Sequence, residues 1–199
     1  MPRCLILGLA GASCSGKTTL ARKIANHAAQ SLSSRSEVIS MDDYYWEDSS
    51  PRHSRDPEYG FANYDCYSSV DWDRMLADVQ KWERRNRSPH SPAVDPMTPS
   101  LLIIEGIFIL NCKPLFDLMD CRIFLTLDHN TLKERRCTRA YDPPDPPGYF
   151  EKYVWPAYEK SLNEVKMEED RITFVDANED TPDELFTSIY GRLKFDELK

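Results

Sequence analysis

Residues 11–18 read Gly11-Ala12-Ser13-Cys14-Ser15-Gly16-Lys17-Thr18 and match the pattern G-x-x-x-x-G-K-[ST] in full. The apolar run Cys4-Leu5-Ile6-Leu7 precedes the pattern, and apolar residues recur at helical spacing over residues 19–25. In this order of strand, glycine loop and helix, backbone N–H groups and the helix N-terminus can face phosphate oxygens. Lys17 is then expected to reach the β- and γ-phosphates, and Thr18 to bind Mg²⁺ through its hydroxyl. A chance glycine-rich turn fits this context poorly, so we predict that the chain binds a nucleoside triphosphate.

The composition describes an acidic chain of moderate length. It has 199 residues, of which 41% are apolar, and a net charge of −8. That length fits one domain with a sizeable core, so we predict a single domain over residues 1–199. An acidic surface repels a phosphate backbone, and we expect no nucleic-acid partner. No pattern in the sequence identifies a protein partner.

Hydropathy and cysteine spacing indicate the cellular compartment of the protein. The apolar run at the N-terminus is short and leads straight into residues 11–18, so it does not read as a removable signal peptide. No other apolar stretch approaches the length of a membrane span, and we expect no membrane association. The six cysteines form no C-x-x-C pair and have no metal-site spacing with the four histidines. We therefore predict reduced thiols in a cytoplasmic protein.

Two further predicted strands carry acidic residues at their carboxyl ends, where parallel sheets bind ligands. Residues 37–41 read as a short strand that is followed by Asp42 and Asp43. Neighbours in an extended backbone point to opposite faces, so only one of these carboxylates can face the phosphate loop; a helix cap or solvated turn is an equal alternative. Residues 100–104 read as a buried parallel strand, and Glu105 fits a Walker B carboxylate acting on Mg²⁺ or its waters.

The segments around these strands have contrasting patterns. Residues 47–63 are polar, contain two prolines and a glycine, and are predicted to form a functional flap. Residues 71–82 carry apolar side chains at helical spacing, and we assign their tryptophans to the core rather than to base stacking. Residues 84–99 hold three arginines and then four prolines. We predict a mobile surface loop there, with the arginines as a solvated cluster.

Three arginines gather late in the chain. A predicted strand over 121–127 leads into a predicted helix over 130–142. Arg135 and Arg139 would share one face of that helix, with Arg136 turned by about 100° from Arg135. The prolines that follow would end the helix, giving an arginine-bearing lid over about 130–148. A solvated basic face is the alternative, but phosphoryl transfer needs fixed positive charge on the moving group, which favours the lid.

The remaining patterns complete an α/β fold. Residues 149–167 are predicted to be helical, with Pro156 in the first turn or at a kink, and residues 171–176 read as the last strand. Thr181 to Glu184 has the spacing of a capping box at a final helix. This alternation predicts a three-layer P-loop kinase fold, with a mostly parallel five-stranded sheet and helices on both faces. The guanine-specifying N-K-x-D tetrapeptide is absent, which favours a small-molecule kinase over a GTPase switch.

Several segments together resemble the nicotinamide riboside kinase family. They are residues 11–19, Ser40-x-Asp42-Asp43-Tyr44-Tyr45, Gly60-Phe61-x-x-Tyr64-Asp65, Ile103-Ile104-Glu105-Gly106, and Arg135-Arg136-x-Thr138-Arg139-x-Tyr141-x-Pro143-Pro144-Asp145-x-Pro147-Gly148-Tyr149-Phe150 with Val154-Trp155-Pro156. The likeness extends from about residue 4 to residue 193. It implies a uridine kinase-like fold and Mg²⁺-dependent transfer of phosphate from ATP, or from GTP. The acceptor would be the 5′-hydroxyl of nicotinamide riboside, and of nicotinic acid riboside, giving the mononucleotide for NAD synthesis.

The resemblance also implies particular roles. Asp42, rather than Asp43, would accept the proton of the 5′-hydroxyl. Asp65, helped by Arg136, would bind the ribose 2′ and 3′ hydroxyls. Tyr45 and Tyr64 would sandwich the cationic pyridinium ring, an arrangement favoured by roughly 0.5 to 2 kcal/mol.

The site residues that the resemblance implies fall into four overlapping sets. The catalytic residues are Lys17, Asp42 and Arg136, and the metal ligands are Thr18, Asp42 and Glu105. The ATP-binding residues are Gly11, Ala12, Ser13, Cys14, Ser15, Gly16, Lys17, Thr18, Thr19, Arg135, Arg139, Glu179 and Asp180. The substrate-binding residues are Asp42, Asp43, Tyr44, Tyr45, Tyr64, Asp65, Arg136, Tyr141 and Asp142.

Two other functions remain open. A uridine or cytidine kinase would share the fold and the mechanism but bind an uncharged pyrimidine. A non-catalytic nucleotide-binding module is a different class of protein, and it would need no base at Asp42.

Overall fold

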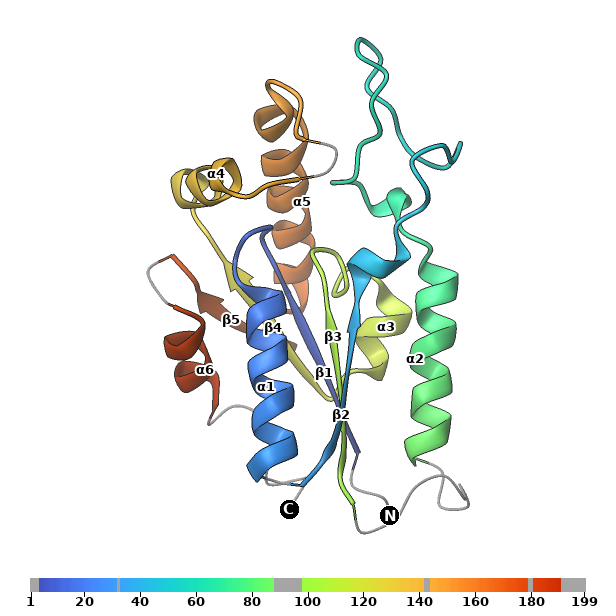
Figure 1. Cartoon of the computed structure of the whole chain (residues 1–199), viewed down its shortest axis with the longest axis vertical. Coiled ribbons are helices and arrows are strands. Elements are labelled where there is room, and N and C mark those ends of the chain that lie inside the picture. Colours follow the sequence, from blue (N-terminus) through green and yellow to red (C-terminus); the bar gives the residue numbers. More distant parts are fainter. Residues whose placement is uncertain (1–3, 32, 88–97, 142–143, 179–180, 191–199) are drawn as a thin grey trace.

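The computed structural model describes residues 4–31, 33–87, 98–141, 144–178 and 181–190. Its strands are β1 (Cys4–Gly11), β2 (Arg35–Ser40), β3 (Ser100–Glu105), β4 (Cys121–Thr126) and β5 (Thr173–Asp176). They form one sheet in the order β2-β3-β1-β4-β5, and every pairing between neighbours is parallel (Figure 1). The predicted five-stranded sheet is confirmed.

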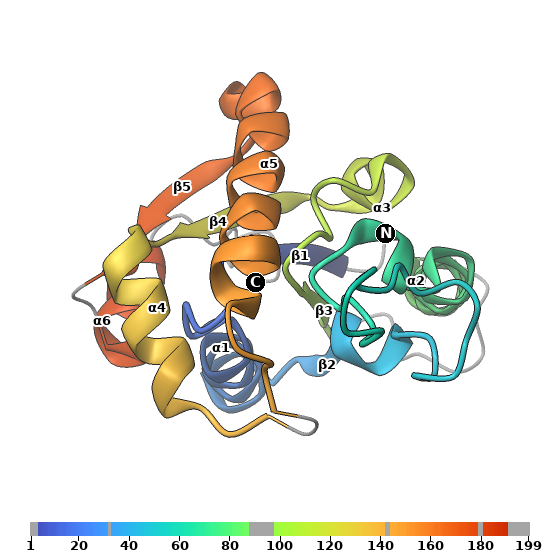
Figure 2. The same cartoon turned by 90° about the horizontal axis from the view of Figure 1, so that it is seen from above.

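Helices cover both faces of the sheet and give the predicted three layers. Helices α1 (Lys17–Ser31) and α6 (Pro182–Tyr190) lie on one face, and α2 (Trp72–Arg87), α3 (Lys113–Leu118) and α5 (Trp155–Val165) on the other (Figures 1 and 2). Helix α4 (His129–Thr138) follows the carboxyl end of β4. Within the described residues, no helix combines the length and the apolar character needed to cross a membrane.

The central strands are buried in the core, and their common direction brings their carboxyl ends to one edge of the sheet. Strands β1 and β3 are apolar along almost their whole length and buried on both faces, as central parallel strands are. Burial of each leucine or isoleucine side chain in these strands contributes roughly 1.5–3 kcal/mol to the stability of the fold. Because all strands run the same way, the phosphate loop, Ser40 and Glu105 emerge at the same edge of the sheet.

The arginines at 84, 85 and 87 do not form the predicted loop. Helix α2 continues to Arg87, so all three lie in its last turn. Arg85 pairs with Glu37 of β2, and Arg87 with Asp120. The predicted solvated cluster is confirmed for Arg84 and Arg85, which are exposed, whereas Arg87 is half-buried beside Asp120. Residues 88–97 lie outside the described residues.

The ends of two other predicted elements also differ. Residue 41 was expected in a strand, but it begins a 3₁₀ turn (Met41–Tyr44) whose N-cap is Ser40. Helix α4 ends at Thr138, since Arg139 has extended dihedrals (φ −89°, ψ 131°). Helix α3 was not predicted at all. Its six residues are too few to establish a helical period in the sequence.

The C-terminal elements follow the sequence predictions. A π-helix (Phe150–Val154) runs into α5, and Pro156 lies in the first turn of α5. Thr181 and Glu184 form the predicted capping box, because the Glu184 carboxylate accepts from the Thr181 N–H at 2.7 Å and the Glu184 N–H donates to the Thr181 hydroxyl at 3.4 Å. Pro156 is tolerated at the start of α5 because the first helical turn does not need its N–H.

Candidate active site

The phosphate loop is a tight turn between β1 and α1. A Cβ atom on Gly11 would lie 2.2 Å from the carbonyl oxygen of Leu125, and the φ of Gly11 is +138°, so only glycine fits there. Gly16 also has a positive φ, of +88°, directly before α1 begins. Lys17 is 7% exposed, and its ammonium group donates a hydrogen bond to the Ala12 carbonyl of the loop at 2.7 Å.

Glu105 joins the loop to the neighbouring strands. Its carboxylate is 2% exposed and accepts hydrogen bonds from the Thr18 hydroxyl at 3.1 Å and the Ser40 hydroxyl at 2.6 Å. These contacts follow from the register, because Glu105 pairs with Ser40 on β2 and with Leu9 on β1. The structure thus brings Thr18 and Glu105, two predicted metal ligands, into direct contact.

Asp42 lies beside this pair and lines the same cavity as Lys17 and Glu105. Asp42 is exposed at the open side of the cavity. Desolvation by the surrounding atoms and the negative charge of Glu105 raise its pKa, against the opposing charges of Lys17 and Arg139. Burial lowers the pKa of Lys17, while Glu105 and Asp42 partly offset that effect. The three charges are therefore coupled at the mouth of the phosphate loop.

The donor set can be compared with the needs of Mg²⁺. Mg²⁺ prefers oxygen ligands and usually keeps several waters while binding one or two carboxylates and the phosphates of a substrate. Thr18, Asp42 and Glu105 offer a hydroxyl and two carboxylates beside the loop. The described residues contain no cluster of three or more histidines, cysteines, aspartates or glutamates that could hold a metal alone. The residues fit an ion that is shared with phosphates.

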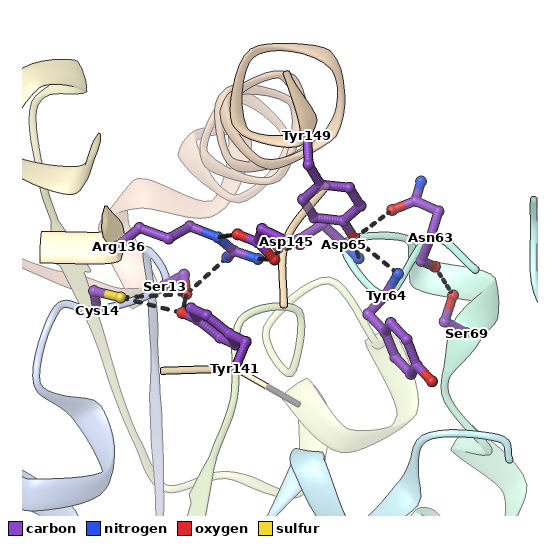
Figure 3. Close-up of polar contacts among 10 residues, drawn as sticks. All are labelled: Ser13, Cys14, Asn63, Tyr64, Asp65, Ser69, Arg136, Tyr141, Asp145 and Tyr149. Atoms are coloured by element: carbon purple, nitrogen blue, oxygen red, sulfur yellow. Dashed lines mark hydrogen bonds and ion pairs between the residues drawn. The ribbon is translucent and has the colours of Figure 1, made fainter. Parts of the chain in front are cut away.

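Arg136 is the centre of a buried polar network (Figure 3). Its guanidinium is 8% exposed and binds both carboxylate oxygens of Asp145, at 2.5 and 3.1 Å. It also donates to Asp65 at 3.3 Å and to the Ser13 hydroxyl at 3.2 Å. Burial opposes the charge of Arg136, but these carboxylates outweigh it and raise its pKa. One side chain of α4 thus connects the phosphate loop with two segments distant in sequence.

Tyr149 holds the segment that carries Asp65. Its hydroxyl accepts from the backbone N–H groups of Tyr64 at 3.0 Å and Asp65 at 3.4 Å, and donates to the Asn63 side chain at 3.2 Å (Figure 3). The Arg136 guanidinium lies 5.6 Å from the centre of the Tyr149 ring. Burial raises the pKa of the Asp65 carboxyl, although Arg136 opposes the shift.

Tyr45 and Tyr64, the two tyrosines expected to enclose the pyridinium ring, are among the aromatic residues that line the cavity. Their ring centres are 5.4 Å apart and their planes are nearly perpendicular, at 88°. The Tyr64 ring also contacts His53 at 4.8 Å, and its hydroxyl donates to Asp48 at 3.2 Å. A ring placed between two parallel rings would need about 7 Å between them. As they stand, the two tyrosines contact each other edge to face and do not form a sandwich.

Arg135, Arg136 and Arg139 are not arranged around one helix as predicted. Arg135 donates to the Asn178 carbonyl at 2.7 Å. Arg136 and Arg139 instead lie over the same Tyr141 ring, at 4.6 and 5.1 Å from its centre. The prediction that Arg135 and Arg139 share a helix face is wrong, because the helix ends before Arg139.

A cavity of about 700 Å³ unites most of the predicted site residues. The predicted residues that line it are Ser13, Cys14, Lys17, Thr18, Asp42, Tyr45, Tyr64, Asp65, Glu105, Arg136, Arg139 and Tyr141. Its walls come from the phosphate loop, the flap of residues 47–63 and the segment that follows α4.

Some predicted site residues lie elsewhere. Tyr44 is buried, and its hydroxyl donates to Asp78 of α2 at 3.0 Å. Asp43 is exposed, and its backbone carbonyl accepts from Arg74. Neither residue lines the cavity, and neither does Thr19. Asp142, Glu179 and Asp180 lie outside the described residues.

Several cavity-lining residues were not predicted, among them Asp145, Tyr149 and Arg55. Asp145 and Tyr149 lie in the proline-rich stretch that carries the family resemblance, but they had no assigned role. Asp145 binds Arg136, nine residues before it, across the end of α4. Tyr149 binds Asn63 and Asp65, and a single sequence gives no sign of contacts between segments so far apart. Arg55 lies in the flap and lines the cavity.

Comparison with known proteins gives the class to which this fold and site belong. Residues 6–142 match the Phosphoribulokinase / Uridine kinase family. Among solved structures, thymidylate kinase from Candida albicans aligns over 98% of this chain and 93% of its own, with a TM-score of 0.54 and 15% identity. That likeness concerns the fold alone. Together the family match, the fold and the phosphate loop define a P-loop kinase.

Relatives at higher identity narrow the class. The chain is 34% identical over 192 residues to nicotinamide riboside kinase 1 from Mus musculus, which covers 95% of this chain and 93% of that protein. It is 31% identical over 152 residues to uridine kinase from Staphylococcus epidermidis, covering 70% of each. The chain belongs to the nicotinamide riboside kinase family, within the wider phosphoribulokinase and uridine kinase family.

Proposed function

We propose that the protein transfers the γ-phosphoryl group of ATP to the 5′-hydroxyl of nicotinamide riboside, and of nicotinic acid riboside, producing the mononucleotide for NAD synthesis. The observation that carries this proposal is the single cavity shared by Lys17, Asp42 and the Asp65–Arg136 pair. Phosphate-binding groups, a base and a polyol-binding pair are the three parts that a nucleoside kinase needs. The names of the relatives supply the substrate class.

The phosphate loop and its neighbours bind the phosphate donor. Lys17 leaves the Ala12 carbonyl and contacts the transferred phosphate, where its positive charge is needed. Mg²⁺, when bound, neutralises charge on the phosphates; Thr18, Asp42 and Glu105 are the residues that would hold it. Arg139 adds positive charge from the segment after α4. GTP is an alternative donor, as the family resemblance implies.

Asp42 accepts the proton of the 5′-hydroxyl. A base must be unprotonated to act, and a carboxylate with a raised pKa is a stronger base than an ordinary one. Asp42 shares the cavity with Lys17, so an acceptor hydroxyl beside it can be directed at the phosphate.

The Asp65–Arg136 pair binds the ribose hydroxyls. A carboxylate accepts hydrogen bonds from both hydroxyls, and the guanidinium donates to their oxygens. The pyridinium ring of the substrate then lies near Tyr45, where the carboxylates of Asp42 and Asp65 add negative charge. For both tyrosines to enclose the ring, Tyr64 has to leave its edge contact with Tyr45.

The test compares two neighbouring aspartates. Asp42→Asn should lower kcat for nicotinamide riboside by about 10² to 10⁴, because it removes the base. ATP binding should change less, because Thr18 and Glu105 still offer oxygen atoms to Mg²⁺. Asp43→Asn is the matched control, since Asp43 does not line the cavity, and it should keep near-normal turnover. Full activity in the Asp42 variant would show that the assigned base is wrong.

A further inference from the structure

The flap places one arginine in the wall of the cavity. Arg55 lines the same cavity as Tyr45, Tyr64 and Asp65. Its two terminal nitrogens donate to backbone carbonyls, that of Gly60 at 3.0 Å and that of Asp48. In the described part of the chain its guanidinium forms no ion pair with a carboxylate. Arg55 is thus held in place by backbone carbonyls, and its exposed guanidinium has no carboxylate within ion-pair distance among the described residues.

The flap that carries Arg55 is anchored to the body of the protein. Residue 55 pairs in an isolated antiparallel bridge with Ala62, and the Asp56 N–H donates to the Phe61 carbonyl at 2.9 Å. The Asp56 side chain is fully buried and binds Lys152 at 2.5 Å and the Tyr153 hydroxyl at 2.5 Å. The residue next to Arg55 is therefore fixed to the helical segment that leads into α5.

Arg55 lies close to the aromatic part of the cavity. It binds the backbone of Asp48, whose carboxylate accepts from the Tyr64 hydroxyl at 3.2 Å. Its charge also lowers the pKa of that hydroxyl, although burial and Asp48 outweigh it and raise the pKa overall. A guanidinium and a carboxylate therefore lie together at the outer end of Tyr64, one of the two tyrosines assigned to the pyridine ring.

We propose that Arg55 is a specificity-determining residue, which binds the carboxylate of nicotinic acid riboside and disfavours the neutral amide of nicotinamide riboside. This inference rests on the proposed function. A guanidinium binds a carboxylate through paired, charge-assisted hydrogen bonds. Nicotinamide riboside carries a net positive charge on its base, so the same guanidinium repels it, whereas the carboxylate of nicotinic acid riboside balances its ring charge. Asp48 opposes Arg55, because it can accept a hydrogen bond from an amide but not from a carboxylate.

The experiment measures kcat/KM for both ribosides in four proteins: the wild type, Arg55→Gln, Arg55→Lys and Arg52→Gln. Arg55→Gln should lower the ratio of nicotinic acid riboside to nicotinamide riboside by about tenfold or more, as expected for a lost hydrogen bond to a charged group. Arg55→Lys keeps the charge but loses the paired geometry, so its ratio should be intermediate and should fall with added salt. Arg52→Gln is the matched control, because Arg52 is in the same flap but lies over the Trp46 ring, 4.2 Å from its centre, and does not line the cavity.

The ratio separates specificity from support of the flap. If Arg55 only supports the flap, Arg55→Gln lowers kcat/KM equally for both ribosides and leaves the ratio unchanged, which overturns the inference alone. An equal change of the ratio in Arg52→Gln overturns it as well. If the wild type phosphorylates uridine but neither riboside, the proposed function fails together with the inference.

Discussion

At the scale of the residue, the geometry of the site depends most on Arg136. It is buried between two carboxylates and two tyrosine rings, and it donates to the phosphate loop through Ser13. A buried ion pair is weak support for stability in itself, because desolvation offsets the attraction. We infer that this one orients the guanidinium, since Asp145 occupies two of its donors and directs the remaining ones towards Asp65 and Ser13.

Replacing Arg136 should affect the nucleoside more than ATP. Arg136→Ala leaves the carboxylates of Asp65 and Asp145 without their partner, and Asp145 is 29% exposed. We expect a loss of about 2 kcal/mol in unfolding free energy, below the full cost of breaking a buried pair. The KM for nicotinamide riboside should rise by about tenfold or more. Steady-state kinetics with each substrate varied, and denaturant unfolding, measure both effects.

The neighbouring arginine provides the contrast. Arg135 donates to the Asn178 carbonyl and does not line the cavity. Asn178 directly precedes residues 179–180, which the family resemblance assigns to ATP binding together with Arg135. Arg135→Ala should therefore raise the KM for ATP and, because Arg135 does not line the cavity, leave that for the nucleoside unchanged. If the two variants show the same pattern, the division of roles between Arg135 and Arg136 is wrong.

The pKa of Asp42 predicts how the activity falls at acidic pH. A base is active when unprotonated, so activity is lost as pH falls through its pKa. Desolvation by neighbouring atoms and the charge of Glu105 raise the pKa of Asp42 above its ordinary value of 3.8. The kcat/KM for the nucleoside should fall on acidification with a midpoint above that value. In Asp42→Asn the residual activity should lack this fall, and an unchanged pH profile would contradict the assignment.

At the scale of the element, the flap depends on its anchor to the helical segment before α5. Asp56 is bound by Lys152 and Tyr153, and these partners hold the pKa of Asp56 well below its ordinary value. A lowered pKa means that the contribution to stability is complete above the pKa of the unfolded chain and is lost as pH falls through that of the folded protein. The anchor should therefore be intact at neutral pH.

Loss of this anchor should loosen the nucleoside site without affecting the phosphate loop. Asp56→Asn should lower the melting temperature at neutral pH and raise the KM for the nucleoside more than that for ATP. The difference in melting temperature from the wild type should begin to shrink as pH falls below about 4, where Asp56 of the unfolded chain takes up a proton, and should vanish only as pH falls through the much lower pKa of the folded anchor. Glu58→Gln, an exposed neighbour in the flap, is the matched control. Equal effects in both variants would argue against the anchor.

At the scale of the whole molecule, sequence patterns predicted the sheet, the three layers and the position of the phosphate loop. They did so because long apolar runs and a complete loop pattern are local signals. The contacts of Tyr149 could not be predicted in the same way, because they join segments that only folding brings together. Those of Asp145 and Arg55 are closer in sequence, but they depend on irregular loop conformations that have no periodic pattern. The end of α4 was missed because the prolines lie beyond residue 142, while the chain leaves the helix at Arg139.

The phosphate loop connects β1 with α1, so a bound nucleotide should stabilise the whole fold. A ligand at 100 times its Kd adds about 2.7 kcal/mol, which for a chain of this size corresponds to an increase in melting temperature of about 5–10 °C. A non-hydrolysable ATP analogue with Mg²⁺ should give this shift in thermal unfolding. Chelating the Mg²⁺ with EDTA should remove most of it, and so should Lys17→Ala. A full shift in the Lys17 variant would contradict the role given to the loop.

The central claim is that this cavity phosphorylates a pyridine riboside. The most direct measurement is ADP release from ATP and Mg²⁺ with nicotinamide riboside, nicotinic acid riboside, uridine, cytidine and adenosine in parallel. We predict the highest kcat/KM for the two pyridine ribosides, because Asp42 and Asp65 place negative charge around a cationic ring. Turnover with uridine or cytidine alone would contradict the account of the substrate, and would place the protein with the uridine kinases that share its fold.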